Sequence, residues 1–121
     1  MHLQDSTTGV RGTVNNSAFP SPLNVAATFD RQLMLRHGEL MGREFRCKGV
    51  NIALAPMINM LRSPGAGRNW EGYGADPYLT SQCARLQIRG IQSQGVIAVA
   101  KHFIGHEQEI GLKYIPSYTQ L

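Results

Sequence analysis

The sequence predicts an α/β fold in which parallel strands alternate with covering helices. Two short apolar segments, VNIALA at 50–55 and VIAVA at 96–100, have the length and β-branched content of buried strands. Each follows a stretch with helical periodicity, so the order along the chain is loop, helix, strand, loop, helix, strand. Continuous apolar strands that alternate with helices indicate a parallel sheet covered on both faces.

The first predicted helix extends from Asp30 to about Lys48. Asp30 is a suitable N-cap, because its carboxylate can accept hydrogen bonds from the N–H groups of the first turn. Gly49 follows in the position where glycine commonly ends a helix. Residues three and four apart predict the buried face, with a carboxylate at its edge: Leu33, His37, Leu40, Met41, Glu44 and Phe45.

The second predicted helix begins after Asp76, has Pro77 in its first position and ends before Gly95. Its predicted buried face consists of Leu79, Cys83, Leu86 and either Gly90 or Ile91. Residues 1–28 and 57–75 are rich in glycine, proline and asparagine, which predicts loops. Within the first loop, Leu3 and Gln4 are what remains of a possible first strand, and Asp5 lies at its end.

Composition indicates a soluble globular chain. Of its 121 residues, 42% are hydrophobic, which is too many for a disordered protein. The formal net charge of +4 comes from scattered basic residues without a long run, so neither nucleic acid nor membrane is an expected partner. We expect no signal peptide at this N-terminus and no span long enough to cross a membrane. The spacing of Cys47 and Cys83 favours buried free thiols over a disulfide.

Polar side chains follow the predicted strands at the points where α/β folds bind ligands. Asp5 follows the possible first strand, Arg68 lies in the long loop after VNIALA, and Lys101 and His102 come directly after VIAVA. A carboxylate, two cations and an imidazole match a neutral polyol, because they accept from and donate to neighbouring hydroxyls. Trp70 or Tyr73 adds a possible ring face for a sugar.

Other interpretations of these residues are open. One alternative is that the polar groups form only buried ion pairs, Lys101 with Glu71 or Arg68 with Asp5, without any ligand. His102 and His106, followed by Glu107 and Glu109, have a spacing that metal hydrolases use on helices, but Gly105 favours a loop there. The glycines of residues 65–67 lack the ending of a phosphate-binding loop. No metal and no cofactor is therefore predicted.

Four segments carry a resemblance to a known family: LQDSTTGVR, NVAATFD, GRNWEGYGADPYL and GIQSQGVIAVAKHFIGHEQE. In this order and at this spacing, they closely resemble glycoside hydrolase family 3, in particular its fungal-type β-glucosidases. The resemblance covers about residues 2–110. It implies a partial (β/α)8 TIM-like barrel of about the first three βα units, left incomplete, over residues 1–112, followed by an off-pattern tail at 113–121.

The same resemblance implies an activity and a set of roles. The family removes terminal non-reducing β-D-glucose, as in cellobiose breakdown, with retention of configuration. Asp5 matches the aspartate that holds the distal hydroxyls of glucose, Arg68 contacts the same sugar, and Lys101 and His102 hold hydroxyls nearer the reacting carbon. A β-glucoside or glucose is thus the expected partner, and the parent enzyme is expected to be secreted.

The chain also departs from the family pattern. Thr7-Thr8 replaces the frequent Pro-Leu, His2 stands where a cysteine is common, and His106 replaces the usual asparagine. From about residue 112 the pattern is lost.

The catalytic carboxylates that the family uses are not expected within this segment. By the resemblance, the nucleophilic aspartate lies downstream in the remainder of the barrel, and the acid/base comes from a second domain. The three aspartates here are Asp5, assigned to binding, and Asp30 and Asp76, assigned to helix caps. No catalytic residue is therefore predicted, and the 121 residues alone are expected to be inactive. The alternative function is that of a non-catalytic carbohydrate-binding fragment.

Overall fold

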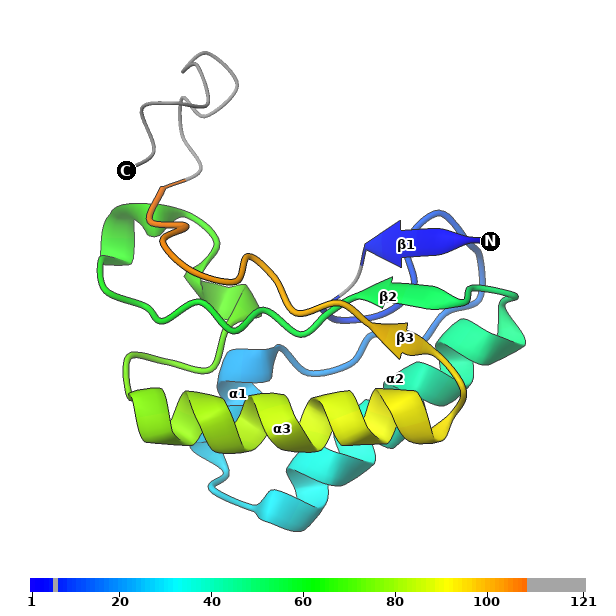
Figure 1. Ribbon diagram of the computed structural model, residues 1–121, viewed down its shortest axis with the longest axis horizontal. Helices are drawn as coiled ribbons and strands as arrows, with labels where there is room; N and C mark the ends of the chain where they lie inside the picture. Colours follow the sequence, from blue (N-terminus) through cyan, green and yellow to red (C-terminus); the bar gives the residue numbers. More distant parts are fainter. Residues whose placement is uncertain (6, 109–121) are drawn as a thin grey trace.

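The computed structural model describes residues 1–5 and 7–108, and these form a small α/β unit (Figure 1). Its strands are β1 (Leu3–Asp5), β2 (Ile52–Leu54) and β3 (Ile97–Ala98). Its helices are α1 (Pro22–Ala27), α2 (Arg31–Cys47) and α3 (Pro77–Ser93), with 3-10 turns η1 (Pro64–Ala66) and η2 (Asn69–Glu71). No helix within this part of the chain is both long and apolar enough to cross a membrane.

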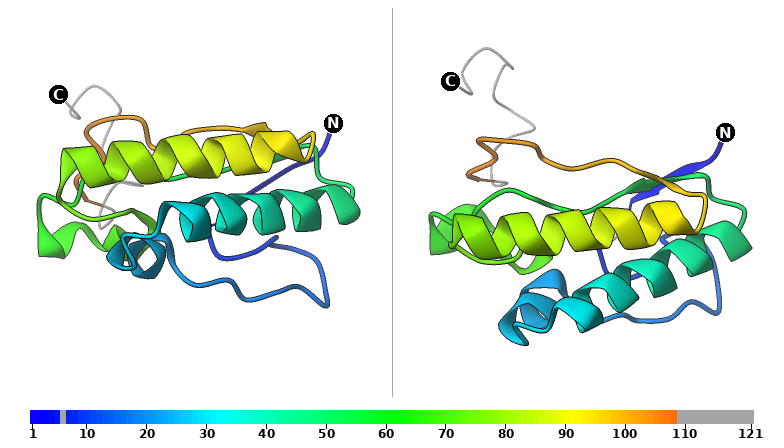
Figure 2. Two further views of the ribbon diagram at one scale, coloured as in Figure 1. Left: turned by 90° about the horizontal axis from the view of Figure 1, so that it is seen from below. Right: turned by 60° about the horizontal axis from the view of Figure 1, so that its bottom comes forward.

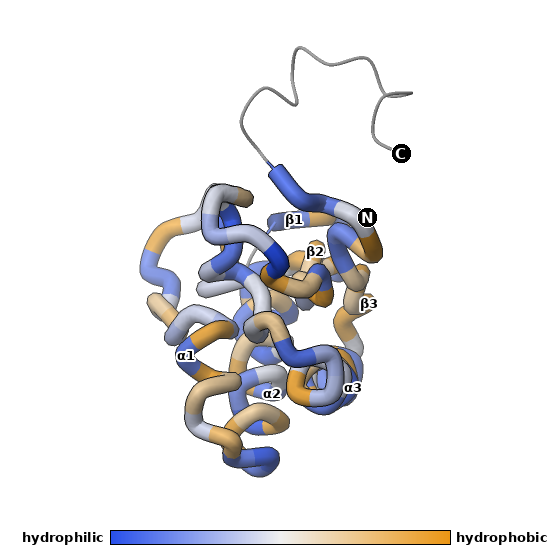
Figure 3. The backbone as a smooth tube through the Cα atoms, turned by 90° about the vertical axis from the view of Figure 1, so that its left-hand side faces the viewer, coloured by the Kyte–Doolittle hydropathy of each residue, from blue (hydrophilic) through white to orange (hydrophobic). Residues whose placement is uncertain are grey.

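The three strands form one parallel sheet in the order β1-β2-β3, as the alternation of strands and helices predicted. In its register, Leu3 pairs with Ile52, and Ala53 pairs with Ala98. Helices α2 and α3 run side by side along one face of the sheet (Figure 2). Figure 3 views the molecule from the end toward which the strands run, with all three helices below the strands.

The expectation of a sheet covered on both faces is wrong for the described residues. Leu3, Ile97 and Val99 are 51%, 52% and 36% exposed, since their side chains point away from the helices. On the opposite face of the sheet, Ala53 is fully buried and Ala98 is partly buried against the core.

Local sequence determines where the two long helices begin and end, as predicted. The Asp30 carboxylate accepts hydrogen bonds from the N–H groups of Gln32 (2.8 Å) and Leu33 (3.1 Å). The Asp76 carboxylate caps α3 through the N–H of Leu79 (2.6 Å). Beyond the other ends, Gly49 and Gly95 have φ angles of +75° and +76°, a backbone conformation that favours glycine.

The buried face of α2 is rotated slightly from the predicted one. Leu33 is 44% exposed, so its predicted burial is wrong. The buried residues are Met34, His37, Gly38, Met41, Gly42 and Phe45. A Cβ atom on Gly38 would lie 2.6 Å from the Gln87 carbonyl oxygen, so the glycines let α3 approach the α2 backbone directly. Close contact along glycines, rather than along the largest apolar residues, sets the rotation of α2.

Two other predictions need correction. The N-terminal loop contains helix α1, where Ser21 accepts a hydrogen bond from the Asn24 N–H and Pro22 occupies the first turn. Both cysteines are free, as expected, and Cys83 is buried. Cys47, however, is exposed, because it lies at the end of α2 on the side away from the core.

Candidate functional site

Four charged side chains gather at the carboxyl ends of the strands. We call Asp5, Arg68, Glu71 and Lys101 the charged cluster. Asp5 is the last residue of β1, and Lys101 follows β3, where it forms a parallel bridge with Met57 beyond β2. Arg68 and Glu71 come from turn η2, in the long loop that follows β2. Because the strands are parallel, their carboxyl ends lie at one edge of the sheet, and this brings together Asp5 and Lys101, which are 96 positions apart in the chain.

Glu71 is the centre of this cluster. Its side chain is 3% exposed, and its two carboxylate oxygens accept hydrogen bonds from Arg68 Nε (2.7 Å) and Nη2 (3.0 Å). Lys101 Nζ lies 3.3 Å from Glu71 Oε2 and 2.5 Å from Asp5 Oδ1, and its side chain is 12% exposed. Of the ion pairs considered as alternatives, Lys101–Glu71 is formed. The cations are therefore held in place before any ligand arrives.

Electrostatics keep both carboxylates ionised. Burial raises the pKa of Glu71, but hydrogen bonds from Arg68 and Lys101 and the charges of these two cations outweigh it, and the pKa is lowered from 4.5. For Asp5, burial is likewise outweighed by the hydrogen bond and charge of Lys101 and by the charges of Arg11 and Arg68, so that its pKa is lowered from 3.8. Arg11 adds an ion pair to Asp5 Oδ2 at 3.3 Å.

His102 adjoins the cluster as a neutral imidazole. Burial, and then the positive charges of His106, Arg68 and Lys101, lower its pKa from 6.5 to about 4. Its ring stacks on that of His106, with centroids 4.0 Å apart and planes 22° apart. Within the described part of the chain, His102 Nε2 is buried and makes no hydrogen bond. A neutral imidazole can both donate to and accept from hydroxyl groups.

The structure brings Asp5, Arg68 and Lys101 together as the sequence predicted, and His102 lies beside them. Tyr73 does not belong to the site: it is 1% exposed, and its hydroxyl donates to Gln87 Oε1 in the core. The ring platform predicted for Tyr73 is therefore wrong, whereas Trp70 is 42% exposed.

Sequence reasoning missed Asn59. This residue is 3% exposed, accepts a hydrogen bond from the His106 N–H (3.0 Å) and donates one to the His106 carbonyl oxygen (2.7 Å). It thereby holds the backbone of His106, whose ring stacks on that of His102. The sequence does contain an indication of this role, because Asn59 is a polar amide among apolar residues just after β2, but the whole stretch was predicted only as a loop.

The described residues do not form the metal site or the phosphate-binding loop that the sequence left open as alternatives. Among residues 1–5 and 7–108, no three histidine, cysteine or acidic side chains gather as a metal site would require. Glu109, part of the possible metal motif, lies outside the described residues. In the stretch considered as a phosphate loop, the Arg68 guanidinium is paired with Glu71.

Fold and cluster together define the class of this protein. It is an α/β protein of parallel strands and covering helices that collects charged residues at the carboxyl ends of its strands, where such folds bind ligands. Comparison with known proteins identifies its family: the profile of the glycosyl hydrolase family 3 N terminal domain matches residues 1–117. The chain belongs to glycosyl hydrolase family 3, as the resemblance predicted.

Similar proteins are β-glucosidases. "Probable beta-glucosidase F" of Aspergillus fumigatus is 53% identical over 109 residues, which are 89% of this chain and 12% of the relative. A family 3 β-glucosidase of Neurospora crassa superposes with a TM-score of 0.86 at 47% identity, covering 90% of this chain and 13% of that one. β-Glucosidase 3B of Thermotoga neapolitana, solved in complex with glucose, gives a TM-score of 0.82 at 39% identity over 88% of this chain and 16% of that one. The chain thus spans about an eighth of the length of its curated relatives.

Proposed function

We propose that this chain supplies part of the glucose-binding side of a retaining β-glucosidase. The observation that carries the proposal is the preorganised charged cluster at the carboxyl ends of three parallel strands. Its fixed donors and acceptors match a ring of neighbouring hydroxyl groups, which both donate and accept hydrogen bonds. Family membership and β-glucosidase relatives support the same substrate class.

Each proposed ligand-binding residue has a distinct task. Asp5 accepts from the distal hydroxyls of the sugar, and Arg68 donates to the same ring. Lys101 has three N–H groups, of which one points to Asp5 and one to Glu71, so a third is available for a hydroxyl nearer the reacting carbon. Neutral His102 contributes its buried ring nitrogen.

We further propose that residues 1–112 form about the first three βα units of a (β/α)8 barrel, with residues 113–121 outside that pattern. Three parallel strands in chain order, with helices along one face, are the repeating unit of such a barrel. The uncovered face, with exposed Leu3 and Ile97, corresponds to strand positions that the remaining barrel would cover. Secretion of the longer enzyme, which the family resemblance implies, stays a prediction.

Cleavage itself requires two carboxylates in suitable positions, and among the described residues those nearest the proposed site and those that cap helices already have other partners. A retaining glycosidase uses a nucleophile and an acid/base about 5–5.5 Å apart. Asp30 and Asp76 cap helices, and Glu71 forms ion pairs with Arg68 and Lys101. We therefore propose that the 121 residues by themselves bind sugar without turnover, which is also what the alternative, a non-catalytic carbohydrate-binding fragment, requires.

The test combines turnover and binding. We expect the purified chain to release no fluorophore from an aryl β-glucoside above a mock preparation, while glucose changes the fluorescence of Trp70, the single tryptophan, which lies between Arg68 and Glu71. Lys101→Ala should weaken glucose binding about ten- to a hundredfold, as expected for one lost charge-assisted contact of roughly 1.5–3 kcal/mol.

Lys48→Ala is the matched control, because Lys48 bonds only to the Val14 and Asn15 carbonyl oxygens among the described residues. Equal glucose affinity in the Lys101 and Lys48 variants would contradict the proposed sugar site. Turnover by the chain that disappears on Lys101→Ala would contradict the assignment of the catalytic carboxylates to the rest of the enzyme.

A further inference from the structure

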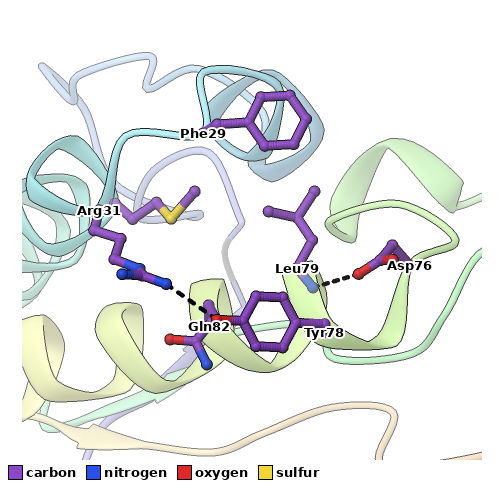
Figure 4. Close-up of a pocket in the computed structure, with 7 residues that line it drawn as sticks. Phe29, Arg31, Asp76, Tyr78, Leu79 and Gln82 are labelled. Atoms are coloured by element: carbon purple, nitrogen blue, oxygen red, sulfur yellow. Dashed lines mark hydrogen bonds between the residues drawn. The ribbon is translucent and has the colours of Figure 1, made fainter.

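A cavity lies between the first turns of α2 and α3, and none of its lining residues belongs to the charged cluster. Its volume is about 560 Å³, within the usual range of small-molecule sites. Figure 4 shows how its walls are built, with an aromatic ring on each side of the opening. We call it the aromatic cavity; its lining residues are Phe29, Arg31, Met34, Asp76, Tyr78, Leu79 and Gln82.

Phe29 is an unusual residue for its position. Its φ angle is +53°, where the backbone follows the end of α1 and its N–H donates to the Ala26 carbonyl oxygen (3.0 Å). That conformation favours glycine and is strained for a bulky side chain. The side chain is 75% exposed, so core packing explains little of its presence. Phe29 directly precedes the Asp30 N-cap and lines the cavity together with Met34, but most of its ring remains uncovered.

Tyr78 provides the second ring. It is 64% exposed, and its hydroxyl accepts a hydrogen bond from Arg31 Nη2 (3.1 Å). This bond joins the first turns of α2 and α3, so the Tyr78 ring and the Arg31 guanidinium are held in fixed relative positions (Figure 4). Two large aromatic surfaces exposed in one cavity are a feature of binding sites rather than of ordinary surface.

The polar groups of the cavity identify the ligand class. Arg31 and Asp76 carry opposite charges, so the cavity has no net charge to select an anion or a cation. Asp76 Oδ1 accepts a hydrogen bond from the Leu79 N–H, and Gln82 Oε1 accepts one from Arg85. Judged by the hydrogen bonds between described residues, the other Asp76 oxygen and the Gln82 amide nitrogen are available to a ligand. Flat apolar faces beside mixed donors and acceptors suit a ring that has C–H faces and hydroxyl edges.

We propose that the aromatic cavity is a second saccharide-binding site, which takes a neutral sugar ring between Phe29 and Tyr78. The class of ligand follows from the cavity, whereas the choice of a β-linked glucose oligomer rests on the proposed function. Such a site would hold one end of a glucan chain at the side of the unit on which α2 and α3 begin.

Hydrogen–deuterium exchange of the full chain with and without cellotetraose tests this site by position. Protection of residues 28–35 and 76–83 reports the aromatic cavity, whereas protection of residues 1–11 and 96–105 reports the charged cluster. Exchange therefore measures ligand binding at the aromatic cavity and at the charged cluster separately. Failure of the second-site proposal can thus be distinguished from failure of the proposed function.

The chain offers a closely matched pair of variants. Phe29→Gly removes the ring and installs the residue that the backbone favours, and Phe103→Gly does the same at φ +57° for a side chain that is 73% exposed and lies outside the cavity. We expect cellotetraose to protect residues 28–35 and 76–83 in the unchanged chain and in Phe103→Gly. In Phe29→Gly, half-maximal protection should need at least about tenfold more ligand, a change that corresponds to about 1.4 kcal/mol.

Three outcomes would overturn the proposal. The first is that the unchanged chain shows no protection of these segments by cellotetraose. The second is equal protection in Phe29→Gly and Phe103→Gly. If Phe29→Gly fails to fold, Tyr78→Ala decides the question, since it removes the opposite ring, and unchanged protection in that variant is the third.

Discussion

Replacing Glu71 by glutamine should destabilise the fold far more than the same replacement at another Arg–Glu pair. Glutamine keeps the size of the side chain and one carbonyl oxygen but removes the charge. Arg68 and Lys101, which are 21% and 12% exposed, would then share the cluster with Asp5 as the single remaining carboxylate. The variant therefore isolates the contribution of the Glu71 charge from that of its volume.

The expected magnitude follows from burial and geometry. Removing one partner of a buried ion pair costs about 3–5 kcal/mol, because the remaining charge stays desolvated without compensation. Glu71 has two cationic partners at 2.7–3.3 Å, but Lys101 keeps Asp5 at 2.5 Å, which offsets part of the loss. We expect a loss of about 3 kcal/mol in the free energy of unfolding at neutral pH.

Glu39→Gln is the matched control. Arg36 and Glu39 have the same three-residue spacing and an N–O distance of 3.0 Å, but their side chains are 61% and 31% exposed. Exposed pairs contribute about 0–1 kcal/mol, so this variant should unfold almost like the unchanged chain.

Urea unfolding measures both variants at one protein concentration, with Trp70 fluorescence for the site and far-ultraviolet circular dichroism for α2 and α3. If the two variants lost the same stability, the charged cluster would be an ordinary surface network and our account of a preorganised site would be refuted.

Three further predictions concern packing, pH and association. Gly90→Ala should lower the free energy of unfolding by about 2 kcal/mol in the same urea experiment, because its Cβ would lie 2.6 Å from the Glu39 nitrogen; Gly65→Ala, with nothing nearer than 3.7 Å, should change little. His102 should titrate near pH 4 when followed by nuclear magnetic resonance. The unfolded chain takes up this proton at a higher pH than the folded chain does, so the free energy of unfolding should rise with pH between about 4 and 6.5. A His102 pKa near 6.5 would contradict the proposed neutral imidazole. The exposed strand face and unpaired sheet edges should make the purified chain oligomerise, as light scattering would show, whereas a monodisperse monomer with a cooperative melt would count against a partial barrel.

The sequence predicts best where one residue controls a local hydrogen bond. Asp30 and Asp76 signal helix starts because a carboxylate before an apolar periodic stretch has few alternative roles, and both cap as expected. The two later strands are equally clear, since VNIALA and VIAVA combine β-branched residues with short length. The short helix α1 was missed because six residues carry too little periodicity, although the Ser21-Pro22 pair was its signal.

Side-chain orientation depends on partners that the sequence does not reveal. The rotation of α2 follows from contact between Gly38 and the Gln87 backbone, so the smallest residues rather than Leu33 mark the interface. Tyr73, in a polar motif, turns inward because Gln87 offers its hydroxyl a buried acceptor. For the site, sequence and resemblance select the residues that we propose bind the sugar, but the central position of Glu71 emerges only from its distances to Arg68 and Lys101.

The position of Glu71 also shows how the order of the three strands brings the charged cluster together. Asp5 ends β1, Glu71 and Lys101 follow β2 and β3, and adjacent parallel strands place their carboxyl ends side by side. Lys101 reaches Asp5 across the end of β2 and also contacts Glu71 from the loop that follows β2. Charge balance then holds the ammonium and guanidinium groups in a buried position without a ligand. Under the proposed function, a sugar would meet donors that folding has already ordered, so that less conformational entropy would be lost when it binds.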